Sequence, residues 1–364
     1  MPSPHDFPSS FSSISALSAL GWDATFAALF AEHAAAGLVP ARIARVDRGL
    51  CDTLTAVGPV RADSSPLTGA DREHTVCTGD WAALRPGAQP QVSALLPRRT
   101  AITRASSDRT SHQQVLAANV DTVVVAVSLA APLNAGRIER LLALAFDSGA
   151  RPIIVLTKAD LAEHPGAGEA VAASLAPGVQ VLTTSAATGA GLDLLSAAVS
   201  GTAVLLGPSG AGKSSLANAL LGRDHMSINQ VRAADGKGRH TTAHRELLAL
   251  PGGGVLIDTP GLRGIGVQDV ADGVGQVFAE IETYARDCTF RDCGHRSEPG
   301  CAVQRAIAAG ELSLDRLDRY RKLLRESEWA ATRGDARQAS KRRKADKAMT
   351  RELRATYRFR GRQR

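Results

Sequence analysis

Long hydrophobic runs, aromatic residues and paired cysteines are all scarce in this chain of 364 residues. No apolar run approaches the length of about 18 residues that a membrane-spanning helix needs, so we expect no membrane partner. No basic stretch precedes an apolar one after Met1, which favours a cytoplasmic protein. The number of cysteines, five, is odd, which argues against a disulfide framework and favours reduced thiols or a metal site.

Acidic residues are rare in the last segment of the chain, residues 331–364. This segment holds 13 Lys and Arg against three acidic residues, a charge of +10, whereas the rest of the chain, with 30 basic and 33 acidic residues, stands at −3. The net charge of +7 therefore belongs to a basic tail. Such a tail is typical of contact with nucleic acid or another polyanion, and the alternative is a solvated, disordered arm.

The length predicts two or three domains, and the chain begins with a leader followed by short strands. Residues 1–36 are rich in Ser and Ala, with one helical pattern over 22–36, and we expect them to be partly disordered. Residues 37–105 show five or six short alternating runs separated by Gly, Pro and Asp, which predicts a small closed β-barrel of the oligonucleotide-binding (OB) type. Aromatic residues make up only 4% of the chain, so we expect any RNA contact of this barrel to depend on backbone phosphates more than on base stacking.

Strand and helix patterns alternate over residues 112–280. Continuous apolar strands separated by helices predict an α/β domain whose largely parallel sheet is covered on both faces. We expect strands at 121–129, 152–156, 180–183 and 202–206, and helices at 135–148, 168–175 and 191–199.

A glycine-rich loop follows the apolar run 202–206 and precedes a helical pattern, and it fits the motif Gly-x₄-Gly-Lys-Ser. Glycines let successive backbone N–H groups surround a phosphate at a helix N-terminus, where the helix dipole also favours negative charge. Lys213 would meet the β- and γ-phosphates as a catalytic group, and the Ser214 hydroxyl would bind Mg²⁺. The nucleotide-binding residues expected here are Gly207, Pro208, Ser209, Gly210, Ala211, Gly212, Lys213, Ser214 and Ser215.

Two other strand ends favour guanine as the base, although each is a weak signal alone. The Asp160 carboxylate can accept hydrogen bonds from N1–H and the N2 amine of guanine, a pattern that adenine cannot present, while the stem of Lys158 can cover the base. A backbone N–H in the second segment could donate to guanine O6. The residues expected to bind the base are Thr157, Lys158, Ala159 and Asp160 in the first segment, and Thr184, Ser185 and Ala186 in the second.

Beyond the phosphate loop, Asp258 ends an apolar strand and Gly261 follows it. We expect Asp258 to hold Mg²⁺ through water and the Gly261 N–H to sense the γ-phosphate. The polar stretch before this strand suits a mobile switch loop, in which either Thr241 or Thr242 would supply a further hydroxyl to Mg²⁺. The base-reading segments precede the phosphate loop at Gly207, the reverse of the usual GTPase order, which indicates a circularly permuted GTPase domain.

A cluster of soft ligands lies within the predicted small, mostly helical domain 281–330. Cys288, Cys293, His295 and Cys301 offer three thiolates and one imidazole, the set of a closed structural zinc site. The alternatives are a redox thiol cluster or ordinary buried cysteines. The other two cysteines, Cys51 and Cys77, are expected to be small buried residues in barrel strands, without a role.

Over roughly residues 35 to 330, the chain resembles the ribosome small-subunit-dependent GTPase A family. The resemblance depends on the permuted order of the motifs, the Gly-Arg-His-Thr-Thr sequence at 238–242, the preceding barrel and the following cysteine cluster. The resemblance implies an OB barrel, a permuted GTPase domain and a C-terminal zinc domain. It also implies binding to ribosomal RNA on the small subunit, stimulation of GTP hydrolysis there, and action late in subunit maturation. Thr157 departs from the family, in which Asn is commoner at this position, and we expect a looser tie between this loop and the phosphate loop. The leader and the basic tail are not explained by the resemblance.

Catalysis also departs from the Ras-type arrangement, because Leu262 stands where a Gln would orient the attacking water. We therefore expect slow intrinsic turnover and an outside stimulus. His240 in the switch loop is the best substitute for positioning water, and the alternative is that it contacts RNA or packs the loop.

The predicted protein is thus a monomeric GTP hydrolase that binds GTP and GDP, Mg²⁺ with the nucleotide, one structural Zn²⁺ ion and the small ribosomal subunit. An RNA-binding assembly module, in which nucleotide serves only as a conformational switch, is the alternative. An ATP-dependent enzyme is disfavoured by the guanine-reading residues.

Overall fold

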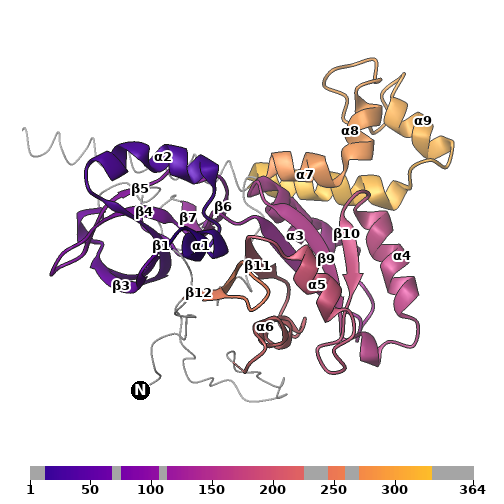
Figure 1. Ribbon diagram of the computed structural model, residues 1–364. Coiled ribbons are helices and arrows are strands. Elements are labelled where there is room, and N and C mark those ends of the chain that lie inside the picture. Colours follow the sequence, from indigo (N-terminus) through magenta and orange to yellow (C-terminus); the bar gives the residue numbers. More distant parts are fainter. Residues whose placement is uncertain (1–12, 68–74, 106–112, 225–244, 259–269, 330–364) are drawn as a thin grey trace, which may run out of the picture.

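The computed structural model describes residues 13–67, 75–105, 113–224, 245–258 and 270–329 (Figure 1). None of the described helices combines the length and apolarity required to cross a bilayer.

Two helices of the leader pack on the barrel: α1 (Ser13–Ala19), which the sequence did not predict, and α2 (Ala24–Ala35). The carboxylate of Asp23 accepts the N–H of Phe26 at 3.0 Å and so caps α2. On the inner face of α2, Phe26 is buried against Trp81 of the barrel. Residues 13–35 are therefore an integral layer of the barrel.

Five strands close into a barrel in the order β1-β2-β3-β5-β4, which confirms the prediction of a small closed barrel (Figure 1). A five-stranded closed barrel is the architecture of the OB fold. The strands are β1 (Val39–Val46), β2 (Leu50–Thr55), β3 (Gly58–Asp63), β4 (Trp81–Arg85) and β5 (Gln91–Leu95).

Cys51 lies in β2 and is fully buried, as expected. The expectation for Cys77 is wrong in one respect, because this residue is buried in the turn before β4 and not in a strand. Its N–H donates to the buried carboxylate of Asp80 at 2.8 Å, and Arg98 pairs with the same carboxylate at 2.7 Å. Side chains thus brace the turn Cys77–Asp80, and backbone hydrogen bonds pair it with Ile43 of β1: the Gly79 N–H donates to the Ile43 carbonyl oxygen at 2.9 Å, and the Ile43 N–H donates to the Asp80 carbonyl oxygen at 2.8 Å.

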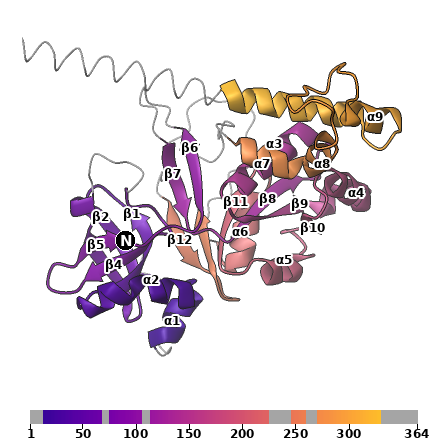
Figure 2. The ribbon, with the colours of Figure 1, turned by 90° about the horizontal axis from the view of Figure 1, so that it is seen from above.

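A two-stranded antiparallel ribbon, β6 (Ala101–Ala105) and β7 (Gln113–Ala118), connects the barrel to the α/β domain. It stands between the barrel and the large sheet in Figure 2. The sequence indicated only a bridge here.

The α/β domain contains a six-stranded sheet of order β10-β9-β8-β11-β13-β12, in which the described strands are parallel except for the edge strand β12. This arrangement confirms the predicted largely parallel sheet. The strands are β8 (Thr122–Ser128), β9 (Arg151–Thr157), β10 (Gln180–Thr183), β11 (Thr202–Leu206), β12 (Glu246–Ala249) and β13 (Val255–Asp258).

Helices cover both faces of this sheet because alternate residues of its strands point to opposite sides. Val123 and Val125 belong to the core on one face, whereas Val124 belongs to the core on the other. The first face is covered by α3 (Ala135–Asp147) and α4 (Pro165–Leu175), with α7 (Ala271–Val277) packed on α3, and the second face by α5 (Leu192–Ala198) and α6 (Lys213–Leu221).

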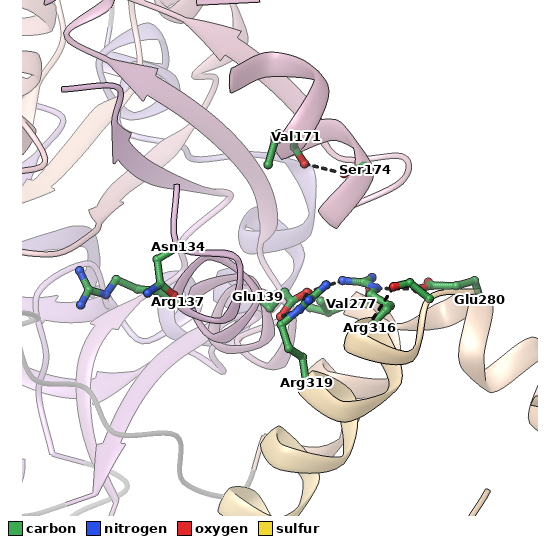
Figure 3. Close-up of polar contacts among 10 residues, drawn as sticks. Asn134, Arg137, Glu139, Val171, Ser174, Val277, Glu280, Arg316 and Arg319 are labelled. Atoms are coloured by element: carbon green, nitrogen blue, oxygen red, sulfur yellow. Dashed lines mark hydrogen bonds and ion pairs between the residues drawn. The ribbon is translucent and has the colours of Figure 1, made fainter. Parts of the chain in front are cut away.

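The C-terminal part consists of α8 (Ala279–Ala285), α9 (Ala302–Ala308) and a long helix over 314–329, which extends across the α/β domain in Figure 1. A buried ion cluster joins this long helix to α3 (Figure 3). The Glu139 carboxylate of α3 is fully buried and accepts from Arg316 at 2.6 Å and from Arg319 at 2.9 Å. Arg316 also pairs with Glu280 at 2.7 Å, so one guanidinium links α3, α8 and the long helix.

Candidate functional site

The candidate nucleotide site lies at the carboxyl edge of the parallel sheet, where ligands bind in open α/β folds. Strand β11 ends at Leu206, directly before the glycine-rich loop, and α6 begins at Lys213. In register beside it, Val204 pairs with Ile257, so β13 brings Asp258 to the same edge. On the other side, β8 separates β11 from β9, whose last residue is Thr157. The three segments converge because parallel strands end at one edge.

The glycines of the loop are required by its backbone. Gly207 lies so close to β8 that an added Cβ would stand 2.5 Å from the Ala126 carbonyl oxygen. Gly212 has φ +81°, a conformation that other residues rarely adopt, and it begins α6. The Lys213 ammonium donates to the carbonyl oxygens of Gly207 and Pro208 at 2.8 and 2.7 Å, so it lies over the mouth of the loop. A cradle of backbone N–H groups with a lysine above it is suited to a phosphate chain.

The base-reading loop is joined directly to the phosphate loop. The buried Thr157 hydroxyl donates to the carbonyl oxygen of Ala211 at 2.7 Å. A Cβ at Gly212 would lie 3.5 Å from Cβ of Thr157 and 3.9 Å from Cε of Lys158, so the stem of this lysine also borders the loop. Thr157, which stands where Asn is commoner, therefore connects the two loops through its hydroxyl.

The two predicted base-reading segments also meet each other. The hydroxyl of Ser185, the buried middle residue of the second segment, donates to the Asp160 carboxylate at 2.5 Å, while Asp160 itself stays exposed. The Ala159 N–H donates to the Thr184 carbonyl oxygen at 3.1 Å, and the Thr184 N–H to Leu156 at 2.7 Å. Ala186 follows as an exposed small residue. An exposed carboxylate held by a serine, beside a phosphate loop, presents acceptors to a base.

Ser209 and Gly210 are exposed at the tip of the phosphate loop, and Ser214 and Ser215 are half-buried in the first turn of α6. Asp258 is half-buried at the end of β13. The other predicted site residues, His240, Thr241, Thr242 and Gly261, lie outside the described residues, as does Leu262.

A second site lies between α8 and the long helix, where Cys288, Cys293, His295 and Cys301 bring four ligand atoms within 4.8 Å of one another. The His295 Nδ1 atom lies 3.6 Å from Sγ of both Cys288 and Cys301, and these two sulfurs are 3.9 Å apart. A tetrahedral zinc ion with ordinary bond lengths requires about 3.6 Å between N and S ligands and about 3.8 Å between two S ligands. The cluster could therefore hold a metal ion, and its spacing fits zinc.

Hydrogen bonds and a left-handed residue hold the backbone around this cluster so that the four ligand side chains face one another. His295 has φ +58°, and the Glu298 carboxylate accepts the N–H groups of Gly294 and Ser297 at 3.0 Å each. Gln304 and Arg321 both donate to the His295 carbonyl oxygen. Arg321 belongs to the long helix, so the cluster is fixed to the same helix that binds α3.

Sequence reasoning missed how several of these residues act. It assigned Ser185 a backbone role, whereas its hydroxyl holds Asp160, and no spacing rule would have revealed that contact. It assigned no role to Arg42 or Asn119, which join the barrel to the α/β domain by hydrogen bonds between segments far apart in the sequence.

Comparisons with known proteins agree with this geometry. The family model described as RsgA GTPase matches residues 95–268. The protein named Small ribosomal subunit biogenesis GTPase RsgA from Streptomyces coelicolor is 58% identical over 334 residues, covering 90% of this chain and 91% of that protein.

Two solved structures share the fold. YjeQ from Thermotoga maritima matches with a TM-score of 0.61 and 23% identity, over 79% of this chain and 98% of that one. YloQ, described as a circularly permuted GTPase, matches with a TM-score of 0.59 and 22% identity, over 80% of this chain and 95% of that one. The fold thus agrees with these two structures, and with 58% identity to the Streptomyces coelicolor protein the chain is a GTP hydrolase that belongs to the RsgA GTPase family.

Proposed function

We propose that this protein hydrolyses GTP to GDP and phosphate when it is bound to the small ribosomal subunit, and that it acts there late in the maturation of the subunit. The observation that carries the proposal is the meeting of the base-reading loop and the phosphate loop through Thr157 and Ala211. The name of the Streptomyces coelicolor relative, Small ribosomal subunit biogenesis GTPase RsgA, supports the choice of partner.

In the proposed site, the phosphate-loop N–H groups and Lys213 bind the β- and γ-phosphates, and Asp160 and Lys158 bind guanine, with the Ser185 segment closing the base pocket. Mg²⁺ would be held by Ser214, by Asp258 through water and by one of Thr241 and Thr242. When bound, the ion neutralises charge that develops on the phosphates. Gly261 would donate its N–H to the γ-phosphate.

Water activation is the step for which the chain lacks the usual residue, because Leu262 has no polar group. We assign water positioning to His240. The partner would then stimulate turnover by placing His240 against the attacking water. Replacing this residue should leave GTP affinity nearly unchanged and abolish the stimulated rate.

Zinc is the metal proposed for Cys288, Cys293, His295 and Cys301, with a structural role, because four protein ligands leave no position for water. A chelator should unfold this part while sparing the nucleotide fold. Protein purified without chelators should contain about one zinc per chain by elemental analysis, and a clear absence of zinc would refute this assignment.

The partner surface is proposed to include the barrel and the basic tail, residues 331–364, both in contact with ribosomal RNA phosphates. A chain that works on ribosomes in this way acts in the cytoplasm, and we propose that it does so as a monomer. Subunit affinity should fall steeply with salt, because bound cations displace condensed counterions. Deleting 335–364 should reduce that slope, and an unchanged slope would remove the tail from the proposal.

The deciding experiment measures GTP hydrolysis by wild type and by His240→Ala, each with and without purified small subunits. We expect stimulation of the wild type and none of the variant. If subunits bind but do not accelerate wild-type turnover, the alternative holds, in which nucleotide serves only as a conformational switch of an RNA-binding module. Competition between GTP and ATP tests the base assignment in the same assay.

A further inference from the structure

The barrel is joined to the α/β domain through Asn119, which lies between β7 and β8 with φ +53°. Its side-chain oxygen accepts the N–H of Arg99 at 3.0 Å, and its amide nitrogen donates to the Gly79 carbonyl oxygen at 3.1 Å. Its own N–H donates to the Thr100 carbonyl oxygen at 2.9 Å. A single buried residue at the start of the α/β domain therefore fixes both the barrel turn and the chain that leaves the barrel.

Arg42 of β1 extends this joint to the strand that carries the phosphate loop. Its guanidinium, 1% exposed, donates to the Thr202 hydroxyl at 2.9 Å and to the Asn119 carbonyl oxygen at 3.2 Å. It also lies over the ring of Trp81, 5.0 Å from the centroid. Thr202 is the first residue of β11, and its N–H is held from the other side by the Asp121 carboxylate at 2.7 Å.

The barrel turn Cys77–Asp80 reaches the strand that ends in Asp258. A Cβ at Gly79 would stand 2.2 Å from the Ala118 carbonyl oxygen and 2.9 Å from Cδ1 of Ile257, so this backbone packs directly on the residue before Asp258. The Thr78 hydroxyl lies 3.5 Å from the Arg245 carbonyl oxygen, at the start of the edge strand β12, and β1 also packs against β12.

Arg42 is a buried charge that the carboxylates of Asp121 and Asp80 attract through space. Among the described residues no carboxylate forms an ion pair with it, and its Nε atom has no hydrogen-bond partner. Burial lowers the pKa of Arg42 to about 10, which still leaves it charged at pH 7. An apolar side chain of similar volume is often as stable as a buried charge, so what Arg42 adds is a directed contact between barrel and β11.

We propose that Arg42 and the turn Cys77–Asp80 form a joint that carries a displacement of the barrel to β11 and β13, which makes Arg42 a positioning residue for partner-stimulated GTP hydrolysis. This inference rests on the proposed function, because it explains how RNA bound to the barrel changes the nucleotide site. The joint contacts the beginning of the strand before the phosphate loop and the strand that ends in Asp258, and in the part of the chain that the structure describes it touches no predicted nucleotide ligand.

The test compares Arg42→Met, Thr202→Val and the double variant in GTP hydrolysis with and without small subunits. Both changes nearly conserve volume and remove opposite ends of one hydrogen bond. We expect the stimulated kcat of each single variant to fall by about fivefold or more, the size of a typical coupling between sites. The KM for GTP, the unstimulated rate and subunit affinity in sedimentation should stay within about twofold. The double variant should be no worse than the more affected single variant.

Thr122→Val is the matched control, because Thr122 is a buried threonine at the start of neighbouring β8, in register with Ala203, and its hydroxyl contacts Arg151 of the α/β domain itself. Thr122→Val should leave the stimulated rate unchanged. Arg42→Lys should keep part of the stimulated rate that Arg42→Met loses. A stimulated rate equal to wild type in both Arg42→Met and Thr202→Val would overturn the joint. So would a loss that is fully explained by weaker subunit binding, or a fall in the control as large as in the variants. If wild type itself is not stimulated, the proposed function fails first, and the two failures remain distinguishable.

Discussion

At the scale of single residues, the hydroxyl of Thr157 joins the two halves of the nucleotide site. Thr157→Val keeps the shape and leaves the Ala211 carbonyl oxygen without this donor, so GDP affinity should fall by about 2- to 10-fold, the usual worth of one hydrogen bond. The measurement is a titration with a fluorescent GDP analogue. Thr183→Val is the control, because the Thr183 hydroxyl, buried at the end of β10, has no partner among the described residues. Equal effects of the two changes would contradict the assigned role.

Asp160 allows a second prediction at this scale. Replacing its acceptor oxygen by the amide donor of Asn requires an acceptor on the base where guanine presents a donor. Asp160→Asn should weaken GTP binding by about 100-fold or more, since two hydrogen bonds to a charged group are lost. The same variant should bind xanthosine nucleotides better than wild type does, because xanthine carries a carbonyl where guanine carries its amine. Competition titrations with GTP, XTP and ATP check both parts, and a uniform loss for all three would point to damage rather than to base reading.

The five cysteines should divide into two reactivity classes. Burial raises the pKa of the Cys51 and Cys77 thiols to about 12, so at pH 8 they hold almost no thiolate and should resist alkylation. The three cysteines of the metal cluster should be protected by the ion and become reactive when a chelator removes it. Mass spectrometry of alkylated native protein should therefore show a gain of three labels on chelation. Labelling of all five cysteines before chelation would contradict both assignments.

At the scale of elements, α2 depends on its cap. Asp23 accepts the N–H of Phe26 and pairs with Arg99 at 2.7 Å, both at the exposed start of the helix. Asp23→Ala should lower the free energy of unfolding by about 1 kcal/mol. Asp23→Asn keeps the cap and loses only the surface ion pair, so it should cost less than about 0.5 kcal/mol. Urea unfolding measures both changes, and an equal loss would mean that the ion pair and not the cap matters.

Elements that are marked by a local pattern of residue types could be predicted from the sequence, whereas contacts between elements far apart in the sequence could not. The phosphate loop and the cysteine cluster depend on short spacings, and the barrel on alternation with turn residues, so all three were found. The ribbon β6–β7 was missed because its strands read as a linker, and β12 because four residues give too short a pattern. The Thr157 tie, the Ser185 contact and the Arg42 joint pair residues that only the folded chain brings together.

At the scale of the whole molecule, the ion cluster around Glu139 connects the C-terminal helix to the α/β domain (Figure 3). Glu139→Ala leaves buried Arg316 without this partner and should cost about 3 to 5 kcal/mol. The double change Glu139→Leu with Arg316→Met should recover most of that loss, because it removes the two most deeply buried charges of the cluster together. Asp318→Asn, which breaks an exposed pair of the same helix, should cost less than about 1 kcal/mol. Denaturant unfolding of the four proteins is the measurement, and similar losses for Glu139→Ala and Asp318→Asn would rule out the cluster as the main connection.

The permuted order of the strands also fixes when, during synthesis, the chain can first hold a nucleotide. The base-reading segments are complete at residue 186, whereas Asp258 is made 72 residues later. At translation speeds of about 5 to 20 residues per second, this interval lasts about 4 to 15 s. During it, β8, β9 and β10 wait for β11 and β13 to be added on the other side of β8. Bound GTP can therefore stabilise the complete site only in a nascent chain that has been made at least as far as Asp258.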